Sequence, residues 1–337
     1  MVFVTGGTGM LGSYLMLELL KQGKSIKASK RIGSSLVNTK IIFRQFSAQA
    51  DELFSEINWI DLDLFDQNNI EEHLTDITEI YHCAAQINSS RKNKGIQIYN
   101  NQKITENLVN AALNKNITKF CHVSSISALG NSINNKAISE TTAWKEHKNN
   151  STYSTSKYYS EMEVWRGIAE GLNAVIVNPS VILGIGDWQK GSANLFDKIY
   201  NNIKYYTHGS SGFVDAKDVS KIMIQLMNCK SCFGQNYIVS ANNVNFKSLF
   251  YKIANALETK KPSKYASPAL TQLAWRLDWL KSKISGIDPL ITKESARTAH
   301  KKLEYDNSKL IKTIAFNYKP FNDTITEIAD IYLSQKT

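Results

Sequence analysis

The chain has 337 residues, of which 42% are hydrophobic, and a formal net charge of +10 at pH 7, so it is long enough for one large domain or two smaller ones. Its lysines are scattered and form no known nucleic-acid motif with aromatic residues, which favours a lysine-rich surface over a nucleic-acid partner and leaves attraction of an anionic substrate open. No apolar run approaches the roughly 20 residues of a membrane-spanning helix, and the first strand begins at Met1 without room for a signal peptide, so we expect a cytoplasmic protein.

The first predicted elements are a strand, a glycine turn and a helix. An apolar strand over residues 1–5 precedes the turn TGGTGMLG, and a helix is expected over residues 11–20. The turn fits both G-x-G-x-x-G and T-G-x-x-G-x-x-G, patterns that bring a pyrophosphate close to backbone N–H groups at a helix N-terminus. A flexible glycine turn is the alternative, but the flanking strand and helix favour nucleotide binding.

The end of the next predicted strand, over residues 25–29, indicates which dinucleotide is bound. Lys30 and Arg31 follow this strand, and no Asp or Glu is near them in the sequence. An acidic residue at this place binds the ribose of NAD, whereas a basic one accommodates the 2′-phosphate of NADP. The pair therefore favours NADP over NAD, with a solvated basic loop as the alternative.

Strands and helices continue to alternate along the chain. We expect strands over residues 58–62, 79–85, 119–123, 174–177 and 236–240, and helices over residues 101–114, 153–171, 193–202, 246–257 and 270–283. This alternation is typical of an α/β Rossmann fold, a doubly wound parallel sheet with helices on both faces. We assign residues 1–180 to the dinucleotide-binding domain, with later returns near 213–240, and residues 181–212 and 241–337 to a smaller, mostly C-terminal substrate-binding cap.

Three side chains are candidates for proton transfer beside a hydride carrier. Tyr153 and Lys157 are four residues apart on a predicted helix and share a face. A tyrosine has a pKa of about 10, which a neighbouring ammonium and an oxidised nicotinamide would lower. Lys157 could also bond the nicotinamide ribose. Ser125, with Ser124 as the alternative, ends a predicted strand and could orient the substrate oxygen.

In this order the motifs resemble an extended short-chain dehydrogenase/reductase of the NAD-dependent epimerase/dehydratase superfamily, over roughly residues 1–260. The closest similarity is to its dihydroflavonol reductase-like and 3β-hydroxysteroid dehydrogenase-like branches, with ETTAW from Glu140 and FVDAKDV from Phe213 resembling the reductase-like branch. The resemblance implies catalysis by Ser125, Tyr153 and Lys157. Together, the motifs and the resemblance assign cofactor contacts to Gly6, Thr8, Gly9, Met10, Leu11, Gly12, Lys30, Arg31, Asp63, Leu64, Ala84, Ala85, Asn101, Tyr153, Lys157 and Pro179.

The resemblance also implies a substrate site and shows two departures from the family pattern. The site would include Gln86, Ile87, Asn88, residues 125–127, Val181, Ile182 and the loop around Trp188. Ser127, Ala128 and Leu129 replace the Asp-Glu pair of sugar dehydratases, which argues against a 4,6-dehydratase. Asn178 stands where many relatives have arginine, which weakens the case for an anionic or sugar-nucleotide substrate.

We therefore expect an NAD(P)-dependent oxidoreductase that interconverts a carbonyl and a secondary alcohol of a small or lipophilic substrate by hydride transfer. One alternative is a nucleotide-sugar epimerase that retains NAD. Another is a scaffold or sensor that binds the dinucleotide without catalysis. Relatives often dimerise through two helices of the sheet domain, which here are residues 101–114 and 153–171, so the resemblance implies a homodimer.

Other candidate side chains have structural interpretations. His82 and His122 lie in predicted strands, and no cluster of His, Asp and Glu indicates a metal. Cys229 and Cys232 form a CxxC without the second pair that a zinc site needs, so we interpret them as structural or incidental.

The predicted helix over residues 270–283 has an apolar face. Trp275 and Trp279 accompany four leucines at helical spacing: Leu270, Leu273, Leu277 and Leu280. We expect this face to pack into the core or to form a lid over the substrate rather than to contact a membrane.

Overall fold

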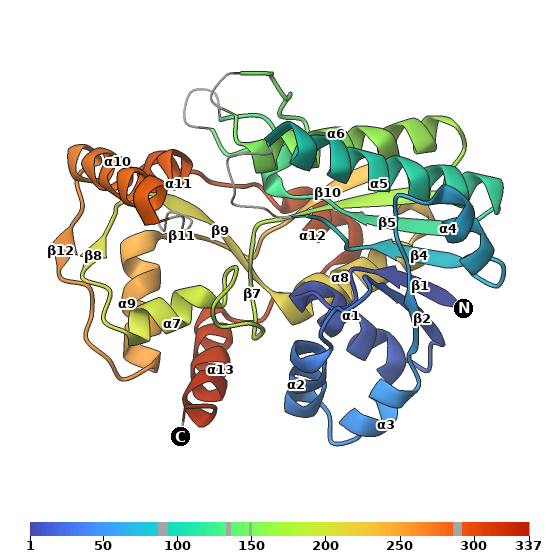
Figure 1. The fold of residues 1–337 in the computed structure, drawn as a ribbon, viewed down its shortest axis with the longest axis horizontal. Coiled ribbons are helices and arrows are strands. Elements are labelled where there is room, and N and C mark those ends of the chain that lie inside the picture. Colours follow the sequence, from blue (N-terminus) through green and yellow to red (C-terminus); the bar gives the residue numbers. More distant parts are fainter. Residues whose placement is uncertain (87–93, 133–135, 148–149, 286–291, 337) are drawn as a thin grey trace.

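The computed structural model describes residues 1–86, 94–132, 136–147, 150–285 and 292–336, and a seven-stranded sheet lies at its centre (Figure 1). The strand order is β10-β6-β5-β4-β1-β2-β3, and every neighbouring pair is parallel. The strands are β1 (Val2–Thr5), β2 (Ile26–Lys30), β3 (Asn58–Asp61), β4 (Glu79–His82), β5 (Lys119–Val123), β6 (Ala174–Pro179) and β10 (Gln235–Val239). The order reverses between β1 and β4, and in such sheets a ligand binds beyond the carboxyl ends of the strands at this point.

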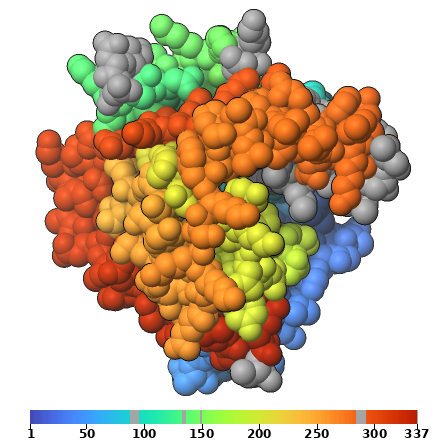
Figure 2. All heavy atoms as spheres, turned by 90° about the vertical axis from the view of Figure 1, so that its left-hand side faces the viewer, coloured from blue at the N-terminus to red at the C-terminus, as the bar shows by residue number. Residues whose placement is uncertain are grey.

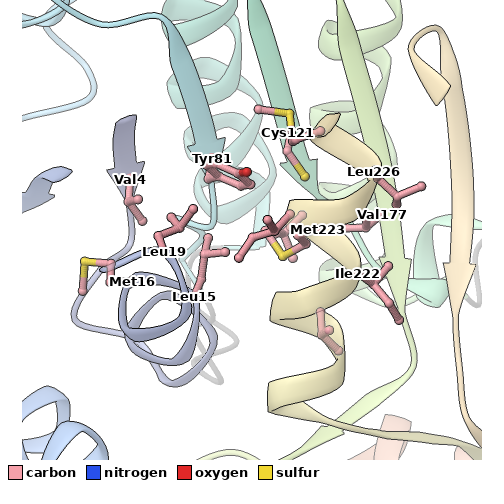
Figure 3. Close-up of a cluster of buried hydrophobic side chains, with 14 of the residues drawn as sticks. Val4, Leu15, Met16, Leu19, Tyr81, Cys121, Val177, Ile222, Met223 and Leu226 are labelled. Atoms are coloured by element: carbon pink, nitrogen blue, oxygen red, sulfur yellow. The ribbon is translucent and has the colours of Figure 1, made fainter. Parts of the chain in front are cut away.

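One face of the sheet is covered by α1 (Met10–Lys21) and α8 (Ala216–Asn228), with α2 (Val37–Phe46) and α3 (Ala50–Ser55) packed outside α1. Figure 3 shows the contact between the two inner helices and four strands. The labelled side chains are Leu15, Met16 and Leu19 of α1, Ile222, Met223 and Leu226 of α8, and Val4, Tyr81, Cys121 and Val177 of the sheet. This buried apolar contact fixes the start of α1 against the end of β1.

The opposite face is covered by α4 (Gln67–His73), α5 (Lys94–Asn114) and α6 (Thr152–Ala169), and α5 and α6 lie side by side (Figure 1). The Ser151 side chain caps α6 by accepting a hydrogen bond from the backbone N–H of Ser154 at 2.8 Å. Such a cap defines where a helix begins. It therefore places Tyr153 and Lys157 in the first two turns of α6, near the carboxyl edge of the sheet.

A second unit carries a smaller mixed sheet in the order β11-β9-β7. In it β7 (Val181–Leu183) and β9 (Ser210–Asp215) are parallel, whereas β9 and β11 (Asn242–Asn245) are antiparallel. The remaining elements of this unit are a strand pair, β8 (Tyr205–Tyr206) and β12 (Lys264–Tyr265), and the helices α7 (Asn194–Tyr200), α9 (Phe246–Ala256), α10 (Pro268–Ser285), α11 (Lys293–Thr298) and α13 (Phe321–Ser334). Helices α7, α9 and α13 share a buried core with this sheet, and α10 and α11 lie at the outer edge (Figure 1).

The expected fold class is confirmed, and several expected bounds change. The strand expected over residues 79–85 already ends at His82, and the helix expected from residue 101 already begins at Lys94. We expected the chain to return to the dinucleotide-binding domain near residue 213. Residues 213–215 belong to β9 of the smaller sheet, and the chain returns to the large sheet with α8. Helix α12 (Ser308–Ile314), which falls in the predicted cap range, packs against β10 of the large sheet. The division into domains remains a prediction.

Of the two roles expected for the apolar face of α10, core packing is wrong for its leucines, whereas a lid over the substrate stays a prediction. Leu270, Leu273, Leu277 and Leu280 are 39%, 54%, 58% and 51% exposed. Helical periodicity shows that an apolar face exists, but it does not show what that face meets. None of the helices that the structure describes has both the length and the apolar content of a membrane span.

Candidate active site

The glycine turn between β1 and α1 leaves the N-terminus of α1 open. Gly9 is the N-cap residue and makes no side-chain capping bond, so the N–H groups of the first turn have no side-chain partner there. A Cβ at Gly12 would lie 2.3 Å from the Gly6 carbonyl oxygen, and a Cβ at Gly6 would lie 2.7 Å from the Ala84 nitrogen. Only glycine allows these backbone approaches. The open helix terminus and the bare backbone fit the pyrophosphate of a dinucleotide.

The other predicted contacts of this turn lie beside it. Thr8, Met10 and Leu11 are partly buried on the loop and the first turn of α1. The Met10 sulfur also lies close to the second unit. It is 3.1 Å from the position that a Cβ at Gly184 would occupy. The segment after β7 therefore packs directly against the glycine turn.

The end of β4 is held against the end of β1 by hydrogen bonds. The Thr5 hydroxyl lies 2.7 Å from Nδ1 of His82 and accepts a hydrogen bond from the Ala84 N–H at 3.3 Å. Nε2 of His82 lies 3.1 Å from the Thr105 hydroxyl of α5. Burial lowers the pKa of His82 to about 3, so the ring is neutral. His82 thus positions the turn that carries Ala84 and Ala85.

Asn101 of α5 holds the next part of that turn. Its side chain accepts a hydrogen bond from the Gln86 N–H at 2.7 Å and donates to the Gln86 carbonyl at 2.9 Å. It also donates to the Ser156 hydroxyl of α6 at 3.3 Å. In the structure, therefore, Asn101 bonds the loop and α6, a positioning role beside the predicted cofactor contact.

The prediction of NADP assumed that no acidic residue lies near Lys30 and Arg31, and the ends of β2 and β3 show that one does. Lys30 and Asp61 are register partners and form an ion pair, so an acidic residue does lie near the basic pair, although it is distant in sequence. Arg31 is exposed and forms no ion pair with any residue that the structure describes. Asp63 is exposed and accepts a hydrogen bond from the Phe65 N–H, and Leu64 next to it is partly buried. Of the two basic residues, Arg31 is thus the one that forms no ion pair among the described residues.

The three predicted catalytic residues meet at the end of β5. The Tyr153 phenol lies beside the Ser125 side chain, which acts to lower the pKa of the tyrosine, and the Ser125 hydroxyl accepts a hydrogen bond from the Ser127 N–H at 3.1 Å. Lys157 is 5% exposed, and its Nζ donates to the Val123 carbonyl at 2.8 Å. The structure therefore brings Ser125, rather than Ser124, to the phenol of Tyr153.

Burial sets the ionisation of the tyrosine and the lysine. It raises the pKa of Tyr153, against the lowering effect of the Ser125 hydrogen bond. We expected Lys157 and an oxidised nicotinamide to lower the pKa of Tyr153. In the protein alone this pKa is raised instead, and the effect of the nicotinamide stays a prediction. Burial lowers the pKa of Lys157 to about 8, and its interactions with Cys83 and Glu161 oppose this shift.

Glu161, one turn beyond Lys157, is a buried carboxylate that the sequence analysis missed. It is 4% exposed and accepts hydrogen bonds from Ser124 at 2.6 Å, Asn178 at 2.8 Å and Trp165 at 3.1 Å. Burial raises its pKa, whereas these donors and Lys157 lower it. The signal was available, because residues 153, 157 and 161 recur at the four-residue spacing of one helix face.

The Glu161 carboxylate also explains the positions of Ser124 and Asn178. Ser124 donates to Glu161 and so is not directed at Tyr153. Asn178 donates to Glu161 and also to the Ser125 carbonyl at 3.2 Å. Asn178 therefore links the serine turn to α6 from the buried end of β6, next to the buried Pro179.

The predicted substrate positions are only partly brought together. Ile87 and Asn88 lie outside the described residues, whereas Gln86 is partly buried at the end of the β4 turn. Val181 and Ile182 lie on β7. Trp188 packs against α13, with its ring 5.0 Å from that of Tyr332, and donates to Gln335. The loop around Trp188 is thus anchored to the C-terminal helix.

Among the described residues, no group of three or more His, Cys, Asp and Glu side chains has a metal-binding arrangement. The expectation of a metal-free site remains a prediction. All four cysteines are free thiols. The Cys229 thiol lies 3.2 Å from the Ser231 hydroxyl, and hydrogen bonds with Cys232 and Ser231 lower its pKa.

Fold and site together define a class of protein: an enzyme that binds a nicotinamide dinucleotide at the carboxyl edge of a Rossmann sheet. The family model described as "NAD dependent epimerase/dehydratase family" matches residues 2–238. Because this match covers more than half of the sequence, the chain belongs to that family. The resemblance inferred from the motifs is confirmed.

Individual relatives are distant but cover nearly the whole chain. The chain is 23% identical over 320 residues to a putative dihydroflavonol 4-reductase of Synechocystis sp., with 93% of this chain and 88% of the relative covered. It is 21% identical over 338 residues to a decarboxylating sterol-4-alpha-carboxylate 3-dehydrogenase of Dictyostelium discoideum, with 94% and 96% covered. A UDP-glucose 4-epimerase structure from Thermotoga maritima matches with a TM-score of 0.77 and 15% identity over 100% of this chain and 99% of that chain, a likeness of fold alone.

Proposed function

We propose that this protein is an NADP-preferring oxidoreductase that interconverts a carbonyl and a secondary alcohol of a small or lipophilic substrate. The observation that carries the proposal is the placement of Tyr153 beside the Ser125 side chain, with the buried Lys157 one turn further along α6. Two adjacent hydroxyl groups are able to hold one substrate oxygen between them. The reductase and dehydrogenase relatives support this reaction type.

Each of the three side chains has a distinct role in the proposed reaction. The dinucleotide supplies or accepts the hydride. Ser125 donates a hydrogen bond to the substrate oxygen and orients it, and Tyr153 gives a proton to that oxygen during reduction or removes it during oxidation. With a pKa of about 8, Lys157 is mostly protonated at neutral pH. We propose that its ammonium, together with the positive charge of the oxidised nicotinamide, favours the phenolate form of Tyr153 once the cofactor is bound.

The direct test removes one oxygen atom. In Tyr153→Phe we expect turnover of a ketone or aldehyde panel to fall by about 10²- to 10⁴-fold, because proton transfer is lost. Dinucleotide affinity, measured by fluorescence titration, should change little. Tyr159→Phe is the matched control, since Tyr159 is a partly buried tyrosine on the same helix that contacts Tyr158 instead. Unchanged turnover in Tyr153→Phe would contradict the assigned role.

The proposed preference for NADP rests on Arg31, because Lys30 is already paired with Asp61. Arg31→Ala should weaken NADPH binding by about 10- to 100-fold, the typical value of a charged hydrogen bond, and leave NADH binding nearly unchanged. Arg44→Ala is the control, since Arg44 is an exposed arginine paired with Asp51. The proposed preference for NADP would be overturned if the wild type bound NADH more tightly than NADPH, or if Arg31→Ala weakened the binding of both cofactors equally.

Two further assays, for retained NAD and for turnover of a nucleotide sugar, distinguish the two alternatives. Purified protein that retains NAD and accepts a nucleotide sugar without net oxidation would be an epimerase. Protein that binds the dinucleotide but turns over no carbonyl or nucleotide sugar would be a scaffold or sensor.

We also propose a cytoplasmic homodimer that associates through α5 and α6. Two large side chains of α5 support this interface, because Ile96 and Tyr99 are 54% and 61% exposed. Replacement of Tyr99 by glutamate should shift the mass measured by light scattering from dimer to monomer. A wild-type monomer at micromolar concentration would contradict the proposal.

A further inference from the structure

Helix α10 exposes an apolar stripe that the proposed reaction does not use. Leu270, Leu273, Leu277 and Leu280 follow one another at intervals of three, four and three residues, and each is 39–58% exposed. In a helix this spacing places all four on one face. Figure 2 shows α10 at the surface, across the upper part of the second unit. A row of four exposed leucines costs free energy in water, so it calls for an explanation.

The stripe points away from the body of the protein. Trp275 and Trp279 stand two residues before and after Leu277, which places them about 160° around the helix, and both are partly buried. Thr271, also on the inner side, lies 2.9 Å from Nε2 of His300, which follows α11. The helix is therefore attached through its aromatic and polar side, and its leucines face outward.

The charges around the stripe are positive. By helical position Arg276 and Lys281 flank it on its two sides, and Lys283 follows one turn later. All three are exposed, and the charged groups of Arg276 and Lys283 lie over the rings of Trp275 and Trp279. The only acidic residue of α10, Asp278, is partly buried on the inner side. Lys264, just before the helix, adds a further exposed positive charge. A second copy of this chain that paired along the stripe would set these cations against each other.

We propose that α10 docks the protein on a lipid bilayer that contains anionic headgroups. The leucines enter the boundary between headgroups and acyl chains, and the flanking cations contact the anionic lipids. Tyr265, on β12 three residues before α10, is 44% exposed, and tyrosines favour this boundary. Docking is peripheral, through one face of one helix, and it does not depend on the proposed reaction.

Vesicle flotation tests the proposal on the full chain. Wild-type protein should float with vesicles of phosphatidylcholine and phosphatidylglycerol, mixed at roughly 3:1, and much less with phosphatidylcholine alone or at high salt. Leu273→Ser together with Leu277→Ser should lower the partition coefficient at least about tenfold, because apolar insertion is lost. Lys281→Ser together with Lys283→Ser should reduce the preference for the anionic vesicles.

Val37→Ser is the matched control, because Val37 is an apolar residue of α2 that is 61% exposed, similar to the 58% of Leu277. It should bind vesicles like the wild type, and thermal unfolding should confirm that every variant is folded. The proposal is overturned if the wild type does not bind anionic vesicles at low salt, or if the leucine variant binds as well as the wild type. A leucine variant that dissociates a wild-type oligomer, without any vesicle binding, would instead identify a second copy as the partner. The salt dependence of the wild type needs no variant and stands as an independent check.

Discussion

At the carboxyl edge of the large sheet charged side chains are buried, whereas along α10 leucines are exposed. Lys157 and Glu161 are 5% and 4% exposed, yet Leu273 and Leu277 are 54% and 58% exposed. Burying a charge and exposing a large apolar side chain both oppose folding. The two regions thus depart from the usual pattern of burial in opposite directions.

The difference lies in what offsets each departure. At the sheet edge, the buried charges have partners within the chain: the Val123 carbonyl for Lys157, and three donors for Glu161. Along α10 the described residues leave the leucines uncovered. A buried charge with partners inside the chain indicates chemistry within the molecule, whereas an uncovered apolar stripe indicates a partner outside it.

The largest expected effect removes the buried cation. In Lys157→Met, turnover should fall by about 10²- to 10⁴-fold, because the phenolate of Tyr153 loses its stabilising charge. Steady-state kinetics with a reducible ketone measure the change. Lys221→Met, at an exposed lysine of α8, should keep full activity. If Lys157→Met is as active as the wild type, the buried lysine does not contribute to catalysis.

Two leucine replacements compare the buried and exposed environments directly. Leu19→Ala in α1 should reduce the free energy of unfolding by about 2–5 kcal/mol, because Leu19 is 0% exposed and a cavity remains. Leu277→Ala in α10 should change it by less than about 0.5 kcal/mol. Urea denaturation measures both. A large loss in Leu277→Ala would show that the stripe is packed within the protein after all.

The pH dependence of stability should reveal the buried lysine. Its pKa is about 8 in the folded protein, against 10.5 as the ordinary value, so the folded state binds its proton less tightly than the unfolded state. The resulting penalty is complete below pH 8 and disappears as the pH rises to 10.5. Lys157→Met should therefore be more stable than the wild type at pH 7, by roughly 1–3 kcal/mol, and the difference should shrink by pH 10. A difference that does not vary with pH would exclude this cause.

The smallest expected effect concerns Glu161. Its negative charge raises the pKa of Lys157, so Glu161→Gln should lower that pKa and move the alkaline decline of activity down by about half a pH unit. The pH profile of kcat separates this effect from a structural one, which would lower activity equally at every pH. Glu163→Gln, at a partly buried carboxylate of α6 that bonds Gln102 and Arg166, should leave the profile unchanged.

Local patterns in the sequence were sufficient to predict the strand, turn and helix at the start of the chain and the alternation that follows. Their signals are the glycine spacing and the period of apolar residues, which depend on near neighbours in sequence. The same kind of signal placed Tyr153 and Lys157 on one helix face. The assignments of catalytic and cofactor residues remain predictions until variants test them.

What could not be predicted depends on contacts between distant segments. Lys30 pairs with Asp61 only because β2 and β3 are neighbours in a particular register. Ser124 and Asn178 converge on Glu161 from two strands and a helix. For α10, the sequence revealed an apolar face but not its direction. In each case tertiary packing decides which residues meet, and local patterns in a single sequence do not reveal that packing.

Helix α12 has a consequence for the order in which the chain is assembled during synthesis. Strand β10 is the edge of the large sheet, and Lys309 of α12 donates to the Asn236 carbonyl of that strand at 2.8 Å, across 73 positions of sequence. A ribosome therefore completes β10 well before it delivers α12. In that interval the Asn236 carbonyl lacks its Lys309 partner, whereas the Ile238 N–H of the same strand already has its acceptor, Glu140, on the chain.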